Sequence, residues 1–378
     1  MEIENNIPLP SENEWSEPTE TLEKKPKHRA RRKKKAPNPA QSLLDAIKFI
    51  KPCQKKAGTP QQQFCCIRGN WIAASSNFMT IGAKVEEDLE ACPQSTQLEE
   101  ALKQVEHTVS IAQVSETTLS VVSGELKALI QCVNADQIAI TPPDARVAFC
   151  DDRIKDAFSV LAPLATEGAS NAVYASVLLQ AGSAVATNGP AMVEYWHGID
   201  LPTILVPKQA VAAIAKTKKS LTGFGYSGPS ATFWFEDDSF IKTQLYNEQY
   251  VNYEQHLKRD DLKPIELHED FFKATKTIAK FTKSGIVYFE NGKLASHELE
   301  QEASTYSIEG LPDGLSFNTK WLLMVESVFK KVHFDCTNRV EGDYILPMAY
   351  FFGDSARGVV LGVKGKIASD LKVDNGTK

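Results

Sequence analysis

The feature that most constrains the fold is an internal repeat, in which three consecutive blocks of about 110 residues follow a similar plan. Each block contains two segments whose apolar residues recur at helical spacing and several whose apolar residues alternate as in strands. Units of this kind complete their cores by joining neighbours, so sheets should continue from block to block while helices line one face. The pattern predicts an α+β fold of three repeated domains, each with two helices packed on antiparallel sheets.

Helices and strands can be placed from apolar periodicity and from capping and turn residues. Helices are predicted to begin at Ser42, at Thr96 as a capping box with Glu99, and after the caps Asp151 and Asp152; others cover 208–219 with Pro207 as the first helical residue, 268–283 and 318–331. Strands are predicted between 105 and 134 and at 65–74, 78–85, 173–180, 221–227, 231–236, 239–246, 332–337, 343–350 and 356–363. Asn291 and Gly292 indicate a two-residue hairpin.

Composition marks the ends of the blocks. Thr141-Pro142-Pro143 is typical of a linker, and we expect domains at 40–142, 143–258 and 259–365, followed by a C-terminal tail at 366–378. Residues 1–39 hold six prolines and few large apolar residues, so burial cannot offset their chain entropy and they should be disordered. Nine basic and no acidic residues lie within 24–35. This run indicates nucleic-acid contact or a localisation signal, or else a solvated tail without a specific role.

The segment 268–283 carries the clearest charge pattern. Lys273, Lys276, Lys280 and Lys283 are spaced so that they fall in one stripe of a helix at ~100° per residue. Aligned lysines repel one another, so a polyanion facing them would explain the stripe, and a solvated helix face is the alternative. If the helices surround DNA, basic residues on them would contact phosphates and fix position without reading bases. The candidate DNA contacts are Lys48, Lys51, Lys103, Arg153, Lys155, Lys208, Lys216, Lys219, Lys273, Lys276, Lys280, Lys283, Lys320 and Lys331.

Short motifs in a fixed order resemble one known family. Residues 186–192 (ATNGPAM) resemble the ATDGHRL turn of the bacterial β sliding clamp, the processivity subunit of DNA polymerase III. Residues 205–208 (LVPK) resemble its VPRK helix start, and 245–253 (LYNEQYVNY) resemble its LVDGRFPDY run. Residues 317–322 (FNTKWL) resemble the FNVSYVL segment of its third domain. The resemblance extends over residues 40–365.

This resemblance implies a function without enzymatic chemistry and without a cofactor or metal. It implies a head-to-tail homodimer in which each protomer forms half of a closed ring around double-stranded DNA, opened by a clamp loader. It also implies a groove between the second and third domains that binds short peptide motifs of a DNA polymerase and other partners. The groove residues carried over are Thr187, Gly189, Pro190, Met192, Val251, Gln255, His256, Trp321, Leu361 and Val363.

The chain departs from the family pattern at two places. Pro190 and Ala191 replace the His and Arg of the turn, and the family's terminal MPMRL becomes 361–365 (LGVKG) with thirteen further residues. A groove with altered selectivity is expected from these changes. Together with the basic tail they suggest a clamp encoded by a phage or mobile element that serves its own polymerase.

Other patterns give weaker indications of function. The GxGxxG match at 223–228 follows a predicted helix and precedes strands, the reverse of a dinucleotide-binding loop, and indicates a hairpin. Asp151 with Asp152, and the acidic run 236–238, could bind a metal, but a helix cap and a polar turn are favoured. The histidines lack metal-ligand spacing. The main alternative function is a monomeric, non-sequence-specific DNA-binding protein that uses the lysine stripe and the tail, and an enzyme with an unrecognised site is a third.

Hydropathy and cysteine usage bear on location. No run reaches the ~18 apolar residues that span a bilayer, and the N-terminal segment lacks the apolar core of a signal peptide, so a cytoplasmic protein without membrane contact is expected. Seven cysteines without a CxxC pair predict buried free thiols in place of disulfides or a zinc site.

Overall fold

A computed structural model describes residues 38–106, 108–297, 303–326, 328–337, 339–341, 344–363 and 365–366. The tails predicted at 1–39 and 366–378 lie outside the described residues, apart from Asn38, Pro39 and Lys366. Asn38 belongs to the folded body. Its side-chain amide donates to the carbonyl of Leu102 at 2.9 Å, and its Oδ1 accepts from the N–H of Ala40 at 2.8 Å. The prediction of disorder is therefore wrong at Asn38.

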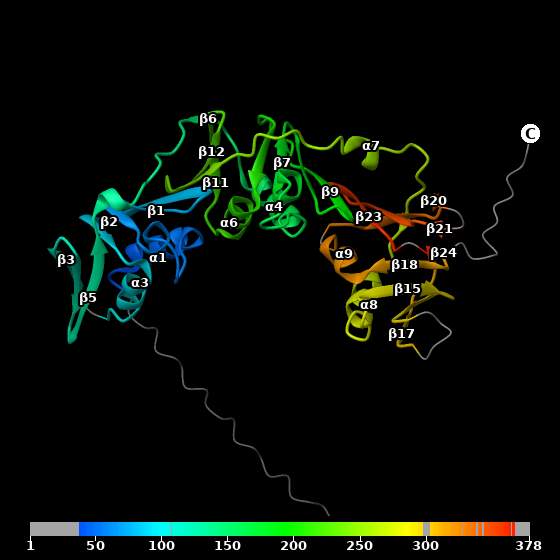
Figure 1. Cartoon of the computed structure of the whole chain (residues 1–378), viewed down its shortest axis with the longest axis horizontal. Helices are drawn as coiled ribbons and strands as arrows, with labels where there is room; N and C mark the ends of the chain where they lie inside the picture. The colour runs from blue at the N-terminus through cyan, green and yellow to red at the C-terminus, as the bar shows by residue number, and fades with distance from the viewer. Residues whose placement is uncertain are drawn as a thin grey trace, which may run out of the picture. The chain divides into compact units, whose positions relative to one another are not determined.

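Antiparallel sheets form the framework of the described chain (Figure 1). The first sheet has the order β3-β4-β5-β2-β13-β12-β11-β6, with β1 also paired to β2. Strands β2 and β13 place the first and second blocks in one sheet, with Ile81 opposite Ile241. The strands are β1 (Cys66–Ser75), β2 (Met79–Pro93), β3 (Ser110–Ser115), β4 (Thr118–Ser123), β5 (Leu126–Val133), β6 (Arg146–Ala148), β11 (Leu221–Tyr226), β12 (Ser230–Phe235) and β13 (Phe240–Gln244).

The second sheet joins the second and third blocks in the same way. Its order is β10-β7-β8-β9-β23-β22-β19-β14, and β9 pairs with β23 so that Met192 lies opposite Val359. The predicted continuation of sheets from block to block is confirmed. The strands are β7 (Ser176–Gln180), β8 (Ser183–Thr187), β9 (Ala191–Trp196), β10 (Ile204–Pro207), β14 (Ile265–Glu266), β19 (Lys331–Asp335), β22 (Met348–Phe352) and β23 (Ala356–Leu361).

Two smaller sheets belong to the third block. One has the order β17-β16-β15-β18, and the other has the order β20-β21-β24. Asn291 and Gly292 join β15 to β16 with φ values of 50° and 69°, as a two-residue primed turn requires, so the predicted hairpin is confirmed. The strands are β15 (Ile286–Glu290), β16 (Lys293–Ala295), β17 (Thr305–Ser307), β18 (Leu315–Asn318), β20 (Arg339–Glu341), β21 (Tyr344–Ile345) and β24 (Gly365–Lys366).

Helices pack in pairs beside the sheets: α1 contacts α3, α4 contacts α6, and α8 contacts α9. Each pair turns its apolar side toward the core, where Leu43, Phe158 and Phe271 are fully buried. Asp151 caps α4 as predicted, because its Oδ1 accepts from the N–H of Arg153 at 3.0 Å. The helices are α1 (Gln41–Ile50), α2 (Pro60–Gln63), α3 (Ser95–Lys103), α4 (Asp152–Leu161), α5 (Ala172–Ala175), α6 (Lys208–Lys216), α7 (Glu254–Leu257), α8 (Phe271–Ile278) and α9 (Thr319–Met324).

Two predicted helix caps and the predicted place of Pro207 are wrong, although α6 begins at Lys208 as predicted. Helix α1 begins before Ser42 and has no side-chain cap. Helix α3 begins at Ser95 after the cap Gln94, whose Oε1 accepts from the N–H of Gln97 at 2.6 Å. The predicted capping box fails because Glu99 instead accepts hydrogen bonds from Lys51 across the helix pair. Pro207 ends strand β10 and stands before the helix, not in its first turn.

Several predicted helices are also too long. The helix expected over 268–283 covers only Phe271–Ile278, and the one expected to reach 331 ends at Met324. After α8 the N–H of Phe281 bonds to Ile278 three residues back, which tightens and ends the helix. The helix expected to reach 219 ends at Lys216, and the first residues of the strand expected at 173–180 form the short helix α5.

Other structural predictions stand. The GxGxxG match lies in the β11–β12 hairpin, and the run 236–238 forms the polar turn between β12 and β13. Cys336 is half-buried and the other cysteines are buried, all as free thiols. None of the helices in the described part of the chain combines the length and apolar character that a bilayer crossing requires.

Candidate functional site

The turn between β8 and β9 forms one wall of the candidate site. Thr187 donates its hydroxyl to the carbonyl of Ala191 at 2.9 Å and accepts from the N–H of Gly189 at 3.1 Å. Asn188 Oδ1 accepts from the N–H of Ala191 at 2.8 Å. Gly189 has φ +93°, a conformation that side-chain-bearing residues rarely adopt. These local bonds hold the turn rigid, and the carbonyl of Pro190 accepts from the N–H of Leu361 on β23 at 2.7 Å.

A separate apolar cluster forms the floor below this turn. Met192 and Val359 face each other across β9 and β23, and Tyr350 continues the cluster onto β22. Tyr253 and Leu257, next to and within α7, pack on the same cluster from the segment that follows β13. The floor is therefore built from side chains of both the second and the third block, which share this sheet.

The turn, the floor and α7 enclose a groove of about 610 Å³. Its lining is mixed, with apolar side chains beside a few polar groups, as is typical of a site that binds a small or extended ligand. The lining residues are Tyr174, Thr187, Gly189, Pro190, Met192, Val251, Gln255, His256, Arg259, Asp335, Thr337, Met348, Tyr350, Val359 and Leu361.

Most of the groove residues predicted from the sequence come together in this cavity. Trp321 and Val363 are not among its lining residues. Lys320 Nζ lies 4.9 Å from the centre of the Trp321 ring, and the N–H of Val363 donates to the carbonyl of Ser316 at 2.8 Å. Sequence reasoning omitted Val359, Met348 and Tyr350. Strand periodicity could have found Val359, because it shares a face of β23 with Leu361.

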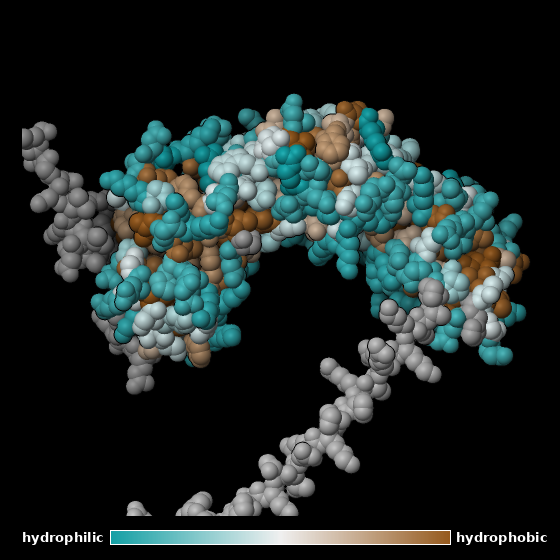
Figure 2. All heavy atoms as spheres, turned by 180° about the vertical axis from the view of Figure 1, so that it is seen from behind, coloured by the Kyte–Doolittle hydropathy of each residue, from teal (hydrophilic) through white to brown (hydrophobic). Residues whose placement is uncertain are grey.

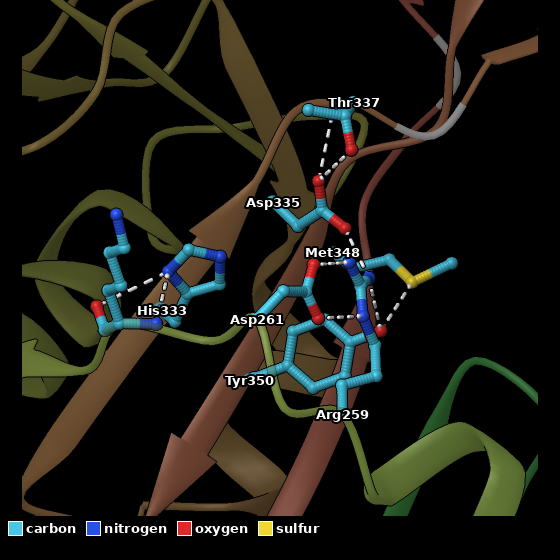
Figure 3. A network of polar contacts seen from close by, with 8 residues as sticks. Arg259, Asp261, His333, Asp335, Thr337, Met348 and Tyr350 are labelled. Carbon is cyan, nitrogen blue, oxygen red and sulfur yellow. Dashed lines mark hydrogen bonds and ion pairs between the residues drawn. The ribbon is translucent and has the colours of Figure 1, made fainter.

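One end of the groove is charged, and Figure 3 shows the network there. Arg259 donates to Asp335 at 2.5 Å and to Asp261 at 2.9 Å, and its guanidinium lies 5.4 Å from the centre of the Tyr350 ring. Thr337 donates its backbone N–H and its hydroxyl to Asp335 at 2.8 and 2.6 Å. Burial raises the pKa of Asp335, but the bonds from Thr337 and Arg259 outweigh it, and this pKa lies below its usual value. No local sequence signal links Arg259 to Asp335.

A second ion pair braces the sheet junction behind the groove. Arg357 donates to Glu194 at 2.8 Å through Nε, and the two side chains are 18% and 5% exposed. Tyr253 donates to the same carboxylate at 3.3 Å and accepts from Gln180 at 2.6 Å. Because these partners come from β9, β23 and the segment before α7, they fix the three walls relative to one another.

The candidate DNA contacts lie on or next to the paired helices, except Lys331, which begins β19. Most of them have partners. Lys208 donates to the carbonyl of Ala165. Among the described residues no ion-pair partner is found for Lys216, Lys280, Lys283 or Lys320, and Lys320 lies over the ring of Trp321. The ion pairs are Lys48–Asp45, Lys51–Glu99, Lys103–Glu99, Arg153–Asp151, Lys155–Asp152, Lys219–Asp237, Lys273–Asp270, Lys276–Glu326 and Lys331–Glu266.

The expectation of a single-sign lysine stripe is wrong in two respects. Only Lys273 and Lys276 lie within α8, because the helix ends at Ile278. Lys273 pairs with Asp270 at 2.9 Å and Lys276 with Glu326 at 2.7 Å, so the face carries both signs. Lys155, a candidate DNA contact, has a side chain that is only 13% exposed and donates to the carbonyl of Lys219 at 2.8 Å.

Comparison with solved structures identifies the fold. The DNA polymerase III subunit beta of Pseudomonas aeruginosa aligns with a TM-score of 0.69 at 15% sequence identity, covering 86% of this chain and 98% of that one. The described chain has the sliding-clamp fold. The DNA polymerase sliding clamp of Bacillus subtilis aligns with a TM-score of 0.70 at 12% identity, covering 86% of this chain and 97% of that one.

A third clamp, the polymerase III beta of Caulobacter crescentus, aligns with a TM-score of 0.68 at 15% identity, covering 86% of this chain and 98% of that one. No protein-family model and no curated protein matches the sequence. The predicted fold class, a sliding-clamp fold of α+β type with antiparallel sheets, is confirmed.

Proposed function

We propose that this chain is a DNA sliding clamp, a processivity factor that performs no catalytic step and keeps a replicative DNA polymerase on duplex DNA. The observation that carries the proposal is the sliding-clamp fold, which the chain shares with bacterial clamps over 86% of its length. Its domains cover 40–142, 143–258 and 259–365. It acts in the cytoplasm of a bacterial or phage-infected cell.

The internal repeat supports ring closure by a second copy. Strand β2 pairs with β13 of the next block, and β9 pairs with β23 of the block after that. Strand β17 occupies the same place in the third block as β9 in the second, at the edge of its sheet. The matching acceptor is β5, which lies in the first block where β13 lies in the second and, in the part of the chain that the structure describes, pairs with β2 only at Cys132 and Val133. A head-to-tail homodimer therefore joins β17 of one protomer to β5 of its partner.

Basic residues next to the helices supply the DNA contacts. Lys216, Lys280 and Lys283 are free to meet phosphates, while exposed pairs such as Lys276–Glu326 exchange a carboxylate for a phosphate at little cost. None of these contacts reads base edges, which suits a protein that moves along DNA.

The groove on the β9–β23 junction binds peptide motifs of the polymerase and of the clamp loader. Its apolar floor fits Leu or Phe anchors, and the rigid turn and α7 form walls that are already in place. Pro190 and Ala191, in place of the family's His and Arg, leave the turn without a charge. This favours motifs without an acidic residue at that wall.

The test is retention on circular DNA. Full-length protein loaded on a nicked circle by its clamp loader should stay bound in high salt and leave when the circle is cut. Loss from the intact circle at the same salt concentration would support the alternative, a monomer that grips DNA from one side. Sizing the free protein adds a second check, because the clamp predicts a dimer of a 41.7 kDa chain.

A further inference from the structure

Two cysteines face each other across the first hairpin, outside the groove and outside the helix faces. Cys66 begins β1 and Cys92 lies near the end of β2. The ladder places Ile67 opposite Ala91, so the next positions along both strands bring Cys66 opposite Cys92. The Cys92 thiol donates to the Cys66 sulfur, with 3.0 Å between the two Sγ atoms.

The backbone position of this pair suits a covalent cross-link. The N–H of Cys65 donates to the carbonyl of Pro93 at 3.1 Å, which makes 65 and 93 a hydrogen-bonded position of the ladder. The adjacent pair, Cys66 and Cys92, then occupies a non-hydrogen-bonded position, where opposing Cα atoms lie about 4.5 Å apart. A disulfide accepts Cα separations of roughly 4.4–6.8 Å, so no backbone movement is needed.

The surroundings of the pair favour reaction at one sulfur. Cys66 and Cys92 line a cavity of about 350 Å³ together with Arg68 and Glu90. The hydrogen bond from Cys92, assisted by Arg68, lowers the pKa of Cys66 to about 7. Burial instead raises the pKa of Cys65, the residue directly before β1, to about 12. Thiolates are the reactive form, so Cys66 is the sulfur of the pair expected to react first, and Cys65 is expected to stay reduced.

We propose that Cys66 and Cys92 are a reversible thiol–disulfide site oxidised by peroxides. The Cys66 thiolate attacks one oxygen of hydrogen peroxide and breaks the O–O bond, and the hydroxide released takes a proton to become water. Cys66 is then a sulfenic acid. Cys92 gives up its proton, and its sulfur displaces the hydroxyl group, which leaves as a second water. The two thiols lose two electrons in total, and the peroxide gains them.

The cross-link ties together a hairpin on which the first sheet depends. Strand β2 pairs with β1, β5 and β13, and the register of β1 on β2 shifts between Gly69 and Trp71. A disulfide between Cys66 and Cys92 joins β1 to β2 at the open end of the hairpin, beyond this register shift. It restricts the unfolded chain and should raise the melting temperature of the oxidised protein.

Peroxide titration of the full-length protein tests the site. Stoichiometric hydrogen peroxide should remove two titratable thiols and two hydrogen atoms from the intact mass, and peptide mapping should find Cys66 joined to Cys92. A dithiol reductant should restore both thiols. Formation should accelerate as pH rises through neutrality, and Arg68→Gln should slow it severalfold.

Matched variants decide the assignment. Cys65→Ala and Cys336→Ser should form the cross-link at the wild-type rate, while Cys92→Ser should form none and lose the melting-temperature difference between oxidised and reduced protein. Folding of each variant is checked by its circular dichroism. Unmodified thiols after peroxide treatment, oxidation of Cys66 to a sulfinic acid with Cys92 still free, or a disulfide between other cysteines would each overturn the proposal.

Discussion

Asp144 shows at the scale of one residue how the blocks are connected. It lies in the segment between β5 and β6, its side chain is 5% exposed, and it accepts from Lys242 at 3.0 Å. Ser230 and Thr232 on β12 also donate to it, at 3.0 and 2.9 Å. Burial raises the pKa of Asp144, but the hydrogen bonds from Ser227, Lys242 and the other donors outweigh it and bring the pKa below 3.8.

The first prediction concerns acid stability. The pKa of Asp144 is lower in the folded than in the unfolded protein. Its contribution to the free energy of unfolding is therefore complete above the unfolded-state pKa near 3.8, and it is lost as pH falls through the folded-state pKa. Asp144→Asn should lower the free energy of unfolding at neutral pH by about 3–5 kcal/mol, since Lys242 stays buried without a counter-charge. It should also reduce the loss of stability below pH 4. Urea unfolding across this pH range measures both effects.

The matched control is Asp45→Asn, which removes an exposed partner of Lys48. It should change the free energy of unfolding by less than about 1 kcal/mol at any pH. An equal effect of the two substitutions would contradict the special role of burial at Asp144.

The second prediction concerns the groove. Leu361→Asp places a carboxylate on the wall of the apolar groove at a half-buried position, and should weaken binding of the polymerase motif by more than about 1 kcal/mol. Met192→Asp should have the same effect with a larger loss of stability, since Met192 is 8% exposed. Peptide binding by fluorescence anisotropy and melting temperature are measured on the same samples. Val114→Asp, on the exposed face of β3, is the control and should leave peptide binding unchanged.

At the scale of elements, edge strands and helix faces carry the proposed assembly. Apolar patches interrupt the hydrophilic surface shown in Figure 2, and the exposed large apolar side chains include Val114 on β3 and Leu129 on β5. Within the described chain β5 pairs with β2 only at Cys132 and Val133, so residues 126–130 have a strand partner on one side alone and can pair with a second chain on the other. On the helix faces many lysines are paired with carboxylates, so the largest contributions to DNA binding should come from the cations that lack an ion pair.

The third prediction tests the β5 edge. Leu129 is 62% exposed and Val114 is 60% exposed, which makes them a matched pair in one sheet, on strands that β4 separates. Leu129→Lys should convert the dimer to a folded monomer, because a charge at position 129 opposes pairing with β17. The melting temperature of this variant should not fall below that of an isolated wild-type protomer. Val114→Lys should leave the dimer intact. Sedimentation velocity distinguishes the two, and a stable dimer of Leu129→Lys would rule out this interface.

The fourth prediction tests the helix faces. Replacing Lys280 and Lys283 with Ala should flatten the salt dependence of DNA binding by ~0.9 per lost phosphate contact. Replacing Lys276 should flatten the slope less, because its charge is already partly neutralised by Glu326. Affinity measured over a series of salt concentrations gives the slopes. Equal slopes for wild type and the Lys280 and Lys283 double variant would place these residues away from DNA.

At the scale of the whole molecule, two shared sheets hold the described body together, and the N-terminal segment before it, residues 1–37, carries a basic run and several prolines. The fifth prediction follows from its composition. Deleting residues 1–37 should leave the melting temperature nearly unchanged, since the segment has too little apolar surface for a core, and should reduce nonspecific DNA affinity at low salt. Calorimetry and low-salt binding test both parts, and a large fall in melting temperature would contradict them.

The sequence by itself determined the local structure and the plan of the repeat. Alternating apolar residues predicted most strands. Asp151 indicated the start of its helix, because a cap bonds to a backbone group two residues away, and Asn291-Gly292 indicated the hairpin. The order of motifs indicated most of the groove as well. Each of these signals depends on neighbours in the chain, and periodicity and turn chemistry express such neighbours directly.

Only the tertiary structure decided which distant residues meet. Arg259 and Asp335 are 76 positions apart, and Lys276 and Glu326 are 50 apart, so no local pattern pairs them. The same limit explains why the prediction of a lysine stripe was wrong. Helical spacing indicated a purely positive face, and the segment after α9 supplies the carboxylate of Glu326. It also explains Cys66 and Cys92, 26 positions apart, whose contact depends on the register of β1 on β2. Register is fixed by packing against the whole sheet, and a single sequence does not state it.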